Sequence, residues 1–179
     1  MTGPSQPSLW IANPGWWTQA GAHIPWLRPD SQHVHIVRSG LEQAVRAPLE
    51  SVRYEVVTLA DDISDRESLM EATKGALRLW DYCRPGWDSW RDCLCDLNDI
   101  WPQCDRLALL WPRSDLLLKS DLPTWLVAID MLREASVFLQ TKPELSQAQE
   151  LAPDYVRHRL MVFETFCFVA DLGAQGPST

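Results

Sequence analysis

The stretch YCRPGWDSWRDCLCDLNDIW, residues 82–101, predicts a short loop followed by one amphipathic helix. Pro85 and Gly86 interrupt the chain, and the apolar residues after them recur at helical spacing. A turn of about 100° per residue gathers these apolar side chains on one face: Trp87, Trp90, Leu94, Leu97 and Trp101. We expect this face to dock on the body of the protein, because a short helix gains most of its stability from such packing.

The opposite face of the predicted helix carries four carboxylates: Asp88, Asp92, Asp96 and Asp99. Like charges four residues apart destabilise a helix by roughly 0.2–0.5 kcal/mol per pair. Aspartate is also a poor helix former outside caps. Only Arg84 and Arg91 lie nearby to offset the charge. The acidic face therefore indicates a surface used by a partner, and a solvated face in an acidic protein is the alternative.

The loop and helix resemble the barstar family, small intracellular inhibitors of secreted bacterial ribonucleases. In that family an aromatic loop and a following helix, written roughly Asp-x-x-x-Asp-x-Leu, plug the nuclease active site. Tyr82 stands at the loop tyrosine, Asp88 and Asp92 at the two helix aspartates, and Leu94 at the leucine. The segment LREA, residues 132–135, matches a Phe/Leu-Arg-Glu-Ala segment whose glutamate also faces the nuclease.

The resemblance covers about residues 54–172 and implies a partner-binding surface. Its predicted members are Tyr82, Asp88, Arg91, Asp92, Asp96 and Glu134. The implied partner is a basic ribonuclease or a ribonuclease toxin, for which this chain would be the immunity protein. Asp92 would take the place of the RNA phosphate, and Asp88 would pair with a second basic group.

The sequence departs from the family pattern in one segment and at two single positions. The segment CRPG, residues 83–86, replaces the usual Tyr-Gly-x-Asn, while Arg91 and Leu97 each replace a tryptophan. An inhibitor with these changes is expected to face a different nuclease. The same changes favour a second hypothesis, in which the scaffold is an adaptor that binds a non-nuclease protein through its N-terminal segment.

The composition agrees with a basic partner. The 179 residues carry a formal net charge of -8, which disfavours unaided binding to nucleic acid because phosphate backbones attract Lys and Arg. No apolar run approaches the length of a membrane span, so no membrane contact is expected. The N-terminus MTGPSQPSLW lacks the basic and apolar regions of a signal peptide, which predicts a cytoplasmic protein. The oligomeric state is left open.

Neither catalysis nor a cofactor is predicted. The sequence has no glycine-rich phosphate loop, HExxH or GxSxG, and Asp88 and Asp92 with a histidine form only a weak signal for metal-assisted hydrolysis. The five cysteines include no CxxC pair and are expected to be free thiols. A zinc site built from Cys83, Cys104 and a histidine is the alternative.

The domain prediction places a Pro/Trp-rich arm at residues 1–30 and a single barstar-like domain at residues 31–172. Within that domain the family core covers about residues 54–172, with an inserted loop at about residues 141–157. Residues 173–179 are predicted to be a tail. We expect the arm to lie on the body or on a partner, because four tryptophans carry a large apolar surface: Trp10, Trp16, Trp17 and Trp26.

A strand and a short helix are predicted before the family core. Residues 33–37 alternate as an edge strand does, with the polar positions outward. His33 and His35 share one face of this strand and could bind a metal, but no third ligand is evident. Residues 41–50 predict a short helix that ends near Pro48, because proline disrupts helix interiors.

The core begins with a strand and a capped helix. Residues 54–59 have the β-branched content of a strand. Ser64, with Glu67 three residues later, predicts the capping box of the first core helix. After the acidic helix, the apolar residues 107–111 predict a strand buried on both faces.

Two further helices and a last strand complete the chain. Ser114 and Asp115 are expected to cap a short helix, and Asp121 starts a second helix that reaches Gln140. Residues 160–170 predict one last strand or two paired strands. Strands separated by helices imply parallel pairing. The prediction is therefore an α/β fold: a small, mainly parallel sheet of three core strands with an extra edge strand, covered mainly on one side by helices.

Overall fold

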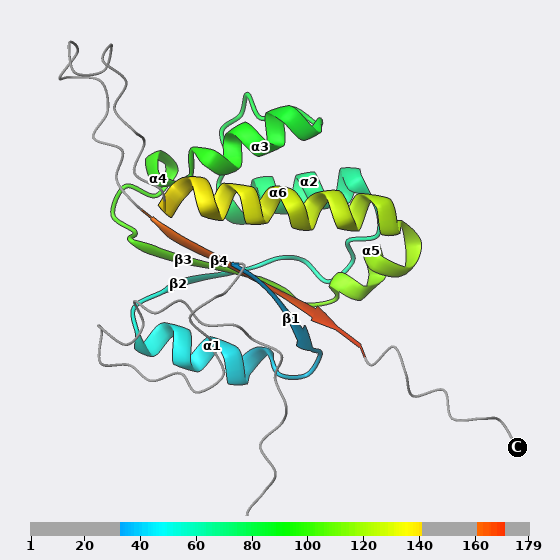
Figure 1. Ribbon diagram of the computed structural model, residues 1–179, viewed down its shortest axis with the longest axis horizontal. Coiled ribbons are helices and arrows are strands. Elements are labelled where there is room, and N and C mark those ends of the chain that lie inside the picture. Colours follow the sequence, from blue (N-terminus) through cyan, green and yellow to red (C-terminus); the bar gives the residue numbers. More distant parts are fainter. Residues whose placement is uncertain (1–32, 141–160, 171–179) are drawn as a thin grey trace, which may run out of the picture.

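The computed structural model describes residues 33–140 and 161–170 (Figure 1). Its four strands form one sheet in the order β1-β4-β3-β2, and all three neighbouring pairs are parallel. The strands are β1 (Val34–Arg38), β2 (Glu55–Thr58), β3 (Arg106–Trp111) and β4 (Val162–Val169). The predicted α/β fold is confirmed, and the last strand is a single one.

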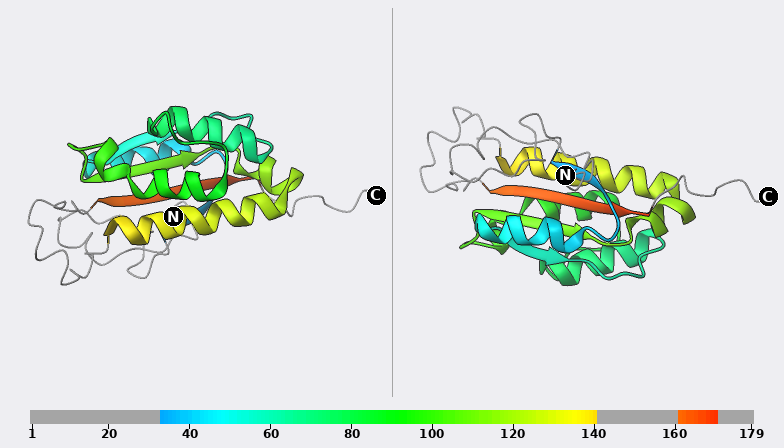
Figure 2. Two further views of the ribbon diagram at one scale, coloured as in Figure 1. Left: turned by 90° about the horizontal axis from the view of Figure 1, so that it is seen from above. Right: turned by 90° about the horizontal axis from the view of Figure 1, so that it is seen from below.

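The helices cover the two faces of this sheet unequally. Of the helices that the structure describes, α1 lies on one face, while α2, α3 and α6 lie on the other (Figures 1 and 2). The bounds are α1 (Glu42–Ser51), α2 (Arg66–Leu77), α3 (Trp87–Cys95), α4 (Leu97–Ile100), α5 (Ser114–Ser120) and α6 (Leu122–Gln140). Within the described residues, none of these helices has both the length and the apolar composition that crossing a bilayer requires.

Strand β3 supplies both hydrophobic cores, as its unbroken apolar sequence predicts. Leu109 and Trp111 face the larger core beneath α2, α3 and α6. Ala108 and Leu110 alternate with them and face the smaller core under α1. Because side chains alternate along a strand, a strand buried on both faces is expected to have apolar residues at successive positions.

Three predicted helix boundaries are wrong. The short helix that Ser114 and Asp115 were expected to cap begins at Ser114 after Arg113 and has no side-chain cap, because the Ser114 hydroxyl instead donates to the Phe168 backbone carbonyl at 2.9 Å. The first core helix is capped by Asp65 rather than by Ser64. The Asp65 carboxylate accepts a hydrogen bond from the Ser68 backbone N–H at 2.8 Å, and the Ser68 hydroxyl accepts one from the Asp65 backbone N–H. Helix α1 continues past Pro48 to Ser51. Val45 and Leu49 are both buried against the sheet, and their packing outweighs the local cost of the proline.

The polar positions of β1 are not all outward, which corrects a further prediction. His35 is buried, and its ring stacks on Phe166 with the centroids 4.5 Å apart. Its Nε2 lies 2.8 Å from a carboxylate oxygen of Glu164, which is also buried.

The predicted arm at residues 1–30, the inserted loop at residues 141–157 and the tail at residues 173–179 lie outside the described residues.

Candidate partner-binding site

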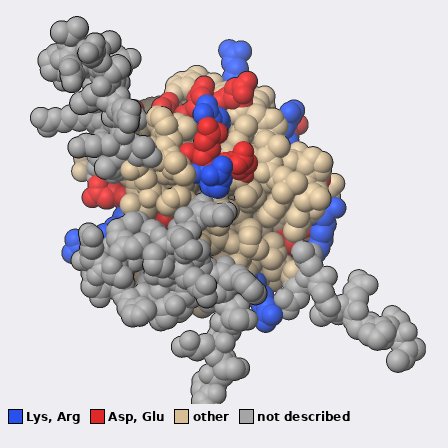
Figure 3. Space-filling view, viewed as in Figure 1, with Lys and Arg blue, Asp and Glu red and all other residues tan. Residues whose placement is uncertain are grey.

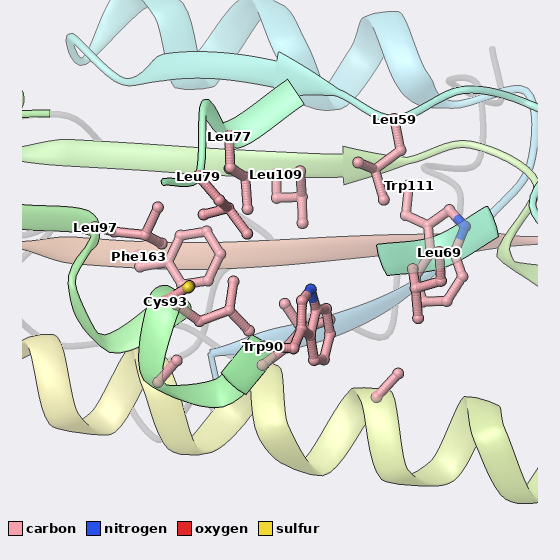
Figure 4. Packing of buried hydrophobic residues seen from close by; sticks show 14 of the residues in the cluster. Leu59, Leu69, Leu77, Leu79, Trp90, Cys93, Leu97, Leu109, Trp111 and Phe163 are labelled. Carbon is pink, nitrogen blue, oxygen red and sulfur yellow. The ribbon is translucent and has the colours of Figure 1, made fainter. Parts of the chain in front are cut away.

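Helix α3 is fixed by its apolar face, as the spacing of its tryptophans predicts. Trp90 is fully buried, and its indole N–H donates to the Thr73 hydroxyl of α2 at 2.8 Å. In Figure 4, Trp90 and Cys93 lie in one packed layer with Phe163 of the sheet. A helix held this firmly presents its other face in a fixed orientation.

The predicted single helix is divided at Asp96, which corrects the sequence interpretation. Asp96 ends α3 and precedes α4, with φ -92° and ψ 9°. Aspartate is a poor helix former, which favours a break at this position, although the Asp96 side chain makes no capping hydrogen bond to α4. Asp88 and Asp92 therefore remain one turn apart on α3, whereas Asp99 lies on α4.

Asp96 also ties the preceding loop to the helix. The Tyr82 hydroxyl donates to Asp96 Oδ2 at 3.1 Å, and Tyr82 is 60% exposed. Local desolvation and this hydrogen bond raise the pKa of Tyr82 to about 12, so the phenol stays protonated as a donor near neutral pH. Trp80 stacks beside it with a centroid distance of 6.4 Å. The loop therefore presents two aromatic side chains next to the acidic helix.

Arg91 and Glu134, both predicted site residues, form an ion pair between α3 and α6. Arg91 Nε donates to Glu134 Oε2 at 2.9 Å, and Arg91 Nη2 donates to Oε1 at 2.5 Å. Hydrogen bonds from this guanidinium hold the pKa of Glu134 below its ordinary value. Arg91 Nη1 lies 3.9 Å from Asp92 Oδ1. Arg91 therefore lies between two of the predicted acidic contacts.

Five of the six predicted residues fall into two groups that are joined by hydrogen bonds or close charge contacts, and the sixth, Asp88, belongs to neither group. Tyr82 and Asp96 form the first group, and Arg91 joins Glu134 and Asp92 in the second. Asp88 is exposed, and no ion pair to it occurs in the part of the chain that the structure describes. Acidic and basic side chains gather in one compact patch on this face, with uncharged atoms around them (Figure 3).

Sequence reasoning missed a second polar cluster, on the other face of the sheet. His33 Nδ1 lies 3.2 Å from Glu164 Oε1, and His35 Nε2 lies 2.8 Å from Oε2. The available signal was a single carboxylate within the aromatic strand VFETFCFV, residues 162–169.

Among residues 33–140 and 161–170, no set of three His, Cys, Asp or Glu side chains is arranged to hold a metal ion. All five cysteines are free thiols.

Comparison with known proteins identifies the scaffold. Residues 54–151 match the family described as Barstar (barnase inhibitor), a range that covers more than half of the 179 residues. Searches of curated proteins and of solved structures found no match. The matched range includes α3, its preceding loop and α6, whereas β1 and α1 precede it. The chain therefore belongs to the Barstar family.

Proposed function

We propose that the chain is an intracellular, non-catalytic inhibitor of a bacterial ribonuclease, or the immunity partner of a ribonuclease toxin. It would plug the nuclease active site with α3 and the preceding loop, and residues 31–172 would act as one domain. The observation that carries this proposal is the pair Asp88 and Asp92. Both are exposed on α3, and the opposite face of this helix is buried in the hydrophobic core.

The chemistry of the pair supports this function. A ribonuclease must hold a polyanion, so its active site is expected to be basic. The Asp92 carboxylate, with a side chain 73% exposed, can enter such a site as a substitute for phosphate and accept charge-assisted hydrogen bonds. Asp88 would pair with a second basic group, and Tyr82 would supply a rigid aromatic contact. Asp96 and the remaining acidic residues would mainly accelerate encounter.

The test combines capture with an activity assay. The full chain is used as bait in a lysate of its source cells, and captured proteins are assayed for RNA cleavage and for inhibition by added bait. We expect a basic nuclease to be retained by the wild type and lost with Asp88→Ala/Asp92→Ala. Retention of the nuclease by both baits would contradict the proposed surface.

Single substitutions locate the anchor within the surface. Asp92→Ala should weaken binding by about 30-fold or more, because truncating one partner of a desolvated charge pair typically costs about 2 kcal/mol or more. Asp99→Ala is the matched control, since Asp99 is also exposed but lies on α4. It should mainly slow association at low salt. Equal losses of affinity would exclude Asp92 as the anchor.

A second candidate function is an adaptor that uses the same scaffold for a non-nuclease protein. The Arg91–Glu134 pair favours it, because a carboxylate paired within the chain is less available to a nuclease. Deleting residues 1–30 should abolish adaptor binding if the Trp-rich arm makes the contact, but should spare nuclease inhibition. The deletion and the double aspartate variant together separate the two functions.

A further inference from the structure

Helix α6 carries apolar side chains on two sides, and one of them faces solvent. Its inner side is buried in the larger core: Ala128, Leu132, Ala135 and Leu139. A second row repeats every three or four residues and falls within about 80° of the helix circumference: Leu122, Leu126, Ile129, Arg133 and Val137. This row is named the outer row of α6. Leu122 and Leu126 are 48% and 54% exposed, although a helix that is apolar on both sides is normally covered on both.

The outer row lies away from the proposed nuclease surface. Glu134, which pairs with Arg91 of α3, projects about 100° around the helix from Arg133. Helix α3 contacts both α2 and α6 and lies between them, so α6 forms one edge of the helical layer (Figure 2). The sheet beneath this edge ends at β1, where Val34 packs against the larger core. Ile36, two residues on, faces the same side and is exposed.

Residues 1–32 join the described fold beside the C-terminal end of α6. His33 Nδ1 lies 3.1 Å from Nε2 of Gln140, the last residue of that helix, and 3.2 Å from Glu164 Oε1. The His33 carbonyl accepts the Thr165 backbone N–H at 2.9 Å. His33 has φ 62°, a left-handed conformation that few residues with a side chain adopt. These contacts fix the point at which the preceding segment reaches the outer row.

The length of this segment is sufficient to cover the outer row. Residues 122–137 span about 23 Å at the helical rise of about 1.5 Å per residue. Trp26 and Trp17 lie within the segment, before His33. At about 3.3 Å per residue an extended chain from His33 brings Trp26 up to about 23 Å away and Trp17 up to about 50 Å away. Tryptophans of residues 1–32 therefore reach every turn of the outer row.

The chemistry of tryptophan fits an apolar row that contains one arginine. An indole ring buries a large apolar area, and its face attracts a guanidinium. Arg133 is exposed and pairs with Asp130 at 3.1 Å. Arg78 already stacks over Trp101 in this protein, with its guanidinium carbon 4.6 Å from the ring centroid. The segment 141–160 also adjoins the end of α6, but it contains no tryptophan.

We propose that residues 1–32 dock in cis along the outer row of α6, with indole rings over its apolar side chains and over Arg133. Attachment at His33 gives the segment an effective concentration of about millimolar order at this surface, which favours it over a second copy of the chain. The inference goes beyond the proposed function and does not depend on it, because Glu134 and the outer row lie on different sides of α6.

The experiment is photochemical cross-linking of the full chain. The photoreactive residue p-benzoylphenylalanine replaces Leu126, and on irradiation it bonds covalently to C–H groups in contact with it. Mass spectrometry of the digested protein locates the cross-linked residue. We expect the cross-links to fall within residues 1–32. The sample contains equal amounts of isotopically heavy and light chains, so that a bond between two copies is recognised by its mixed mass.

A matched position tests whether the contact is specific to α6. The same photoreactive residue replaces Glu71, which is exposed on α2. Cross-links to residues 1–32 should be lost at this position. Thermal denaturation of each variant checks that the fold is retained.

Substitution of three tryptophans tests the chemistry of the contact. The photoreactive residue stays at position 126, and cross-links to residues 1–32 should be lost with the combined changes Trp16→Ser, Trp17→Ser and Trp26→Ser. Gln19→Ser changes a polar residue of the same segment and should keep them.

Four results would overturn the proposal. Cross-links from position 126 to residues 141–160, or between heavy and light chains, would show a different occupant. Cross-links that fall only outside residues 1–32 would show that the segment does not lie on the outer row. Equal yields from position 71 would show that the contact is unspecific. Cross-links retained after the three tryptophan substitutions would exclude the indole rings as the contact.

Discussion

The two faces of the sheet each hold a glutamate bonded to basic side chains, in opposite environments. Glu164 lies on the α1 face, fully buried, with His33 and His35 each against one carboxylate oxygen. Glu134 lies on the α3 face, where its side chain is 45% exposed and paired with Arg91. The first cluster is enclosed by the fold, and the second is open to a partner.

The buried polar cluster stabilises the fold, whereas the exposed pair is accessible to a partner. His33 and His35 come from β1 or its start, whereas Glu164 comes from β4, so their bonds help to fix one strand against its neighbour. Burial opposes ionisation of Glu164, but the hydrogen bonds from the two histidines outweigh it and hold the pKa of Glu164 below its ordinary value. The exposed pair carries little stability and can exchange partners.

The largest expected effect follows from breaking the buried cluster. Glu164→Ala should lower the free energy of unfolding by about 3–5 kcal/mol, because it leaves buried polar partners without compensation. Urea denaturation measures the change. Glu134→Ala is the matched control and should leave the free energy of unfolding nearly unchanged, because exposed ion pairs contribute little. Similar losses for the two variants would contradict the distinction between the faces.

A smaller effect is expected where α3 is anchored. Thr73→Val should reduce the free energy of unfolding by about 1–3 kcal/mol, since it leaves the buried Trp90 indole N–H without its acceptor. Thr73→Ser keeps the hydroxyl and should lose much less. If denaturation curves of the two variants coincide, the hydrogen bond does not hold α3 in place.

The smallest effect is a change in pH dependence. Because the folded-state pKa of Glu164 is lowered, the unfolded state binds a proton first as the pH falls. Its contribution to stability is therefore complete above the ordinary glutamate value of 4.5 and is lost as the pH falls through the lower folded-state pKa. Glu164→Gln has no carboxyl group to titrate at this position. The free energy of unfolding of this variant should therefore fall less steeply as the pH is lowered. An unchanged slope would exclude Glu164 as its source.

Local patterns in the sequence predicted most of the fold. The apolar spacing of Trp90, Leu94 and Leu97 identified the buried face of the acidic segment, and the unbroken apolar run identified β3 as a central strand. These patterns report which side chains are buried. They do not report which residue caps a helix when several can, which explains the shift from Ser64 to Asp65.

The contacts that patterns could not predict join residues far apart in the chain. Arg91 and Glu134 are separated by 43 residues, and His35 and Glu164 by 129. Their pairing depends on how α3 meets α6 and on β1 lying beside β4, neither of which leaves a periodic signal. The resemblance placed Arg91 and Glu134 on one surface, but only the tertiary structure joins them in an ion pair.

The order of the strands has a consequence for aggregation. β4 reads VFETFCFV, an aromatic and β-branched sequence with one charge, and such segments pair readily with copies of themselves when their edge is open. β1 pairs along β4 from Val34–Thr165 to Arg38–Val169 and covers that part of its edge. β1 itself is only five residues long and ends in an exposed arginine, both features that discourage strand addition. The extra strand thus shields the C-terminal part of this aggregation-prone segment from other chains.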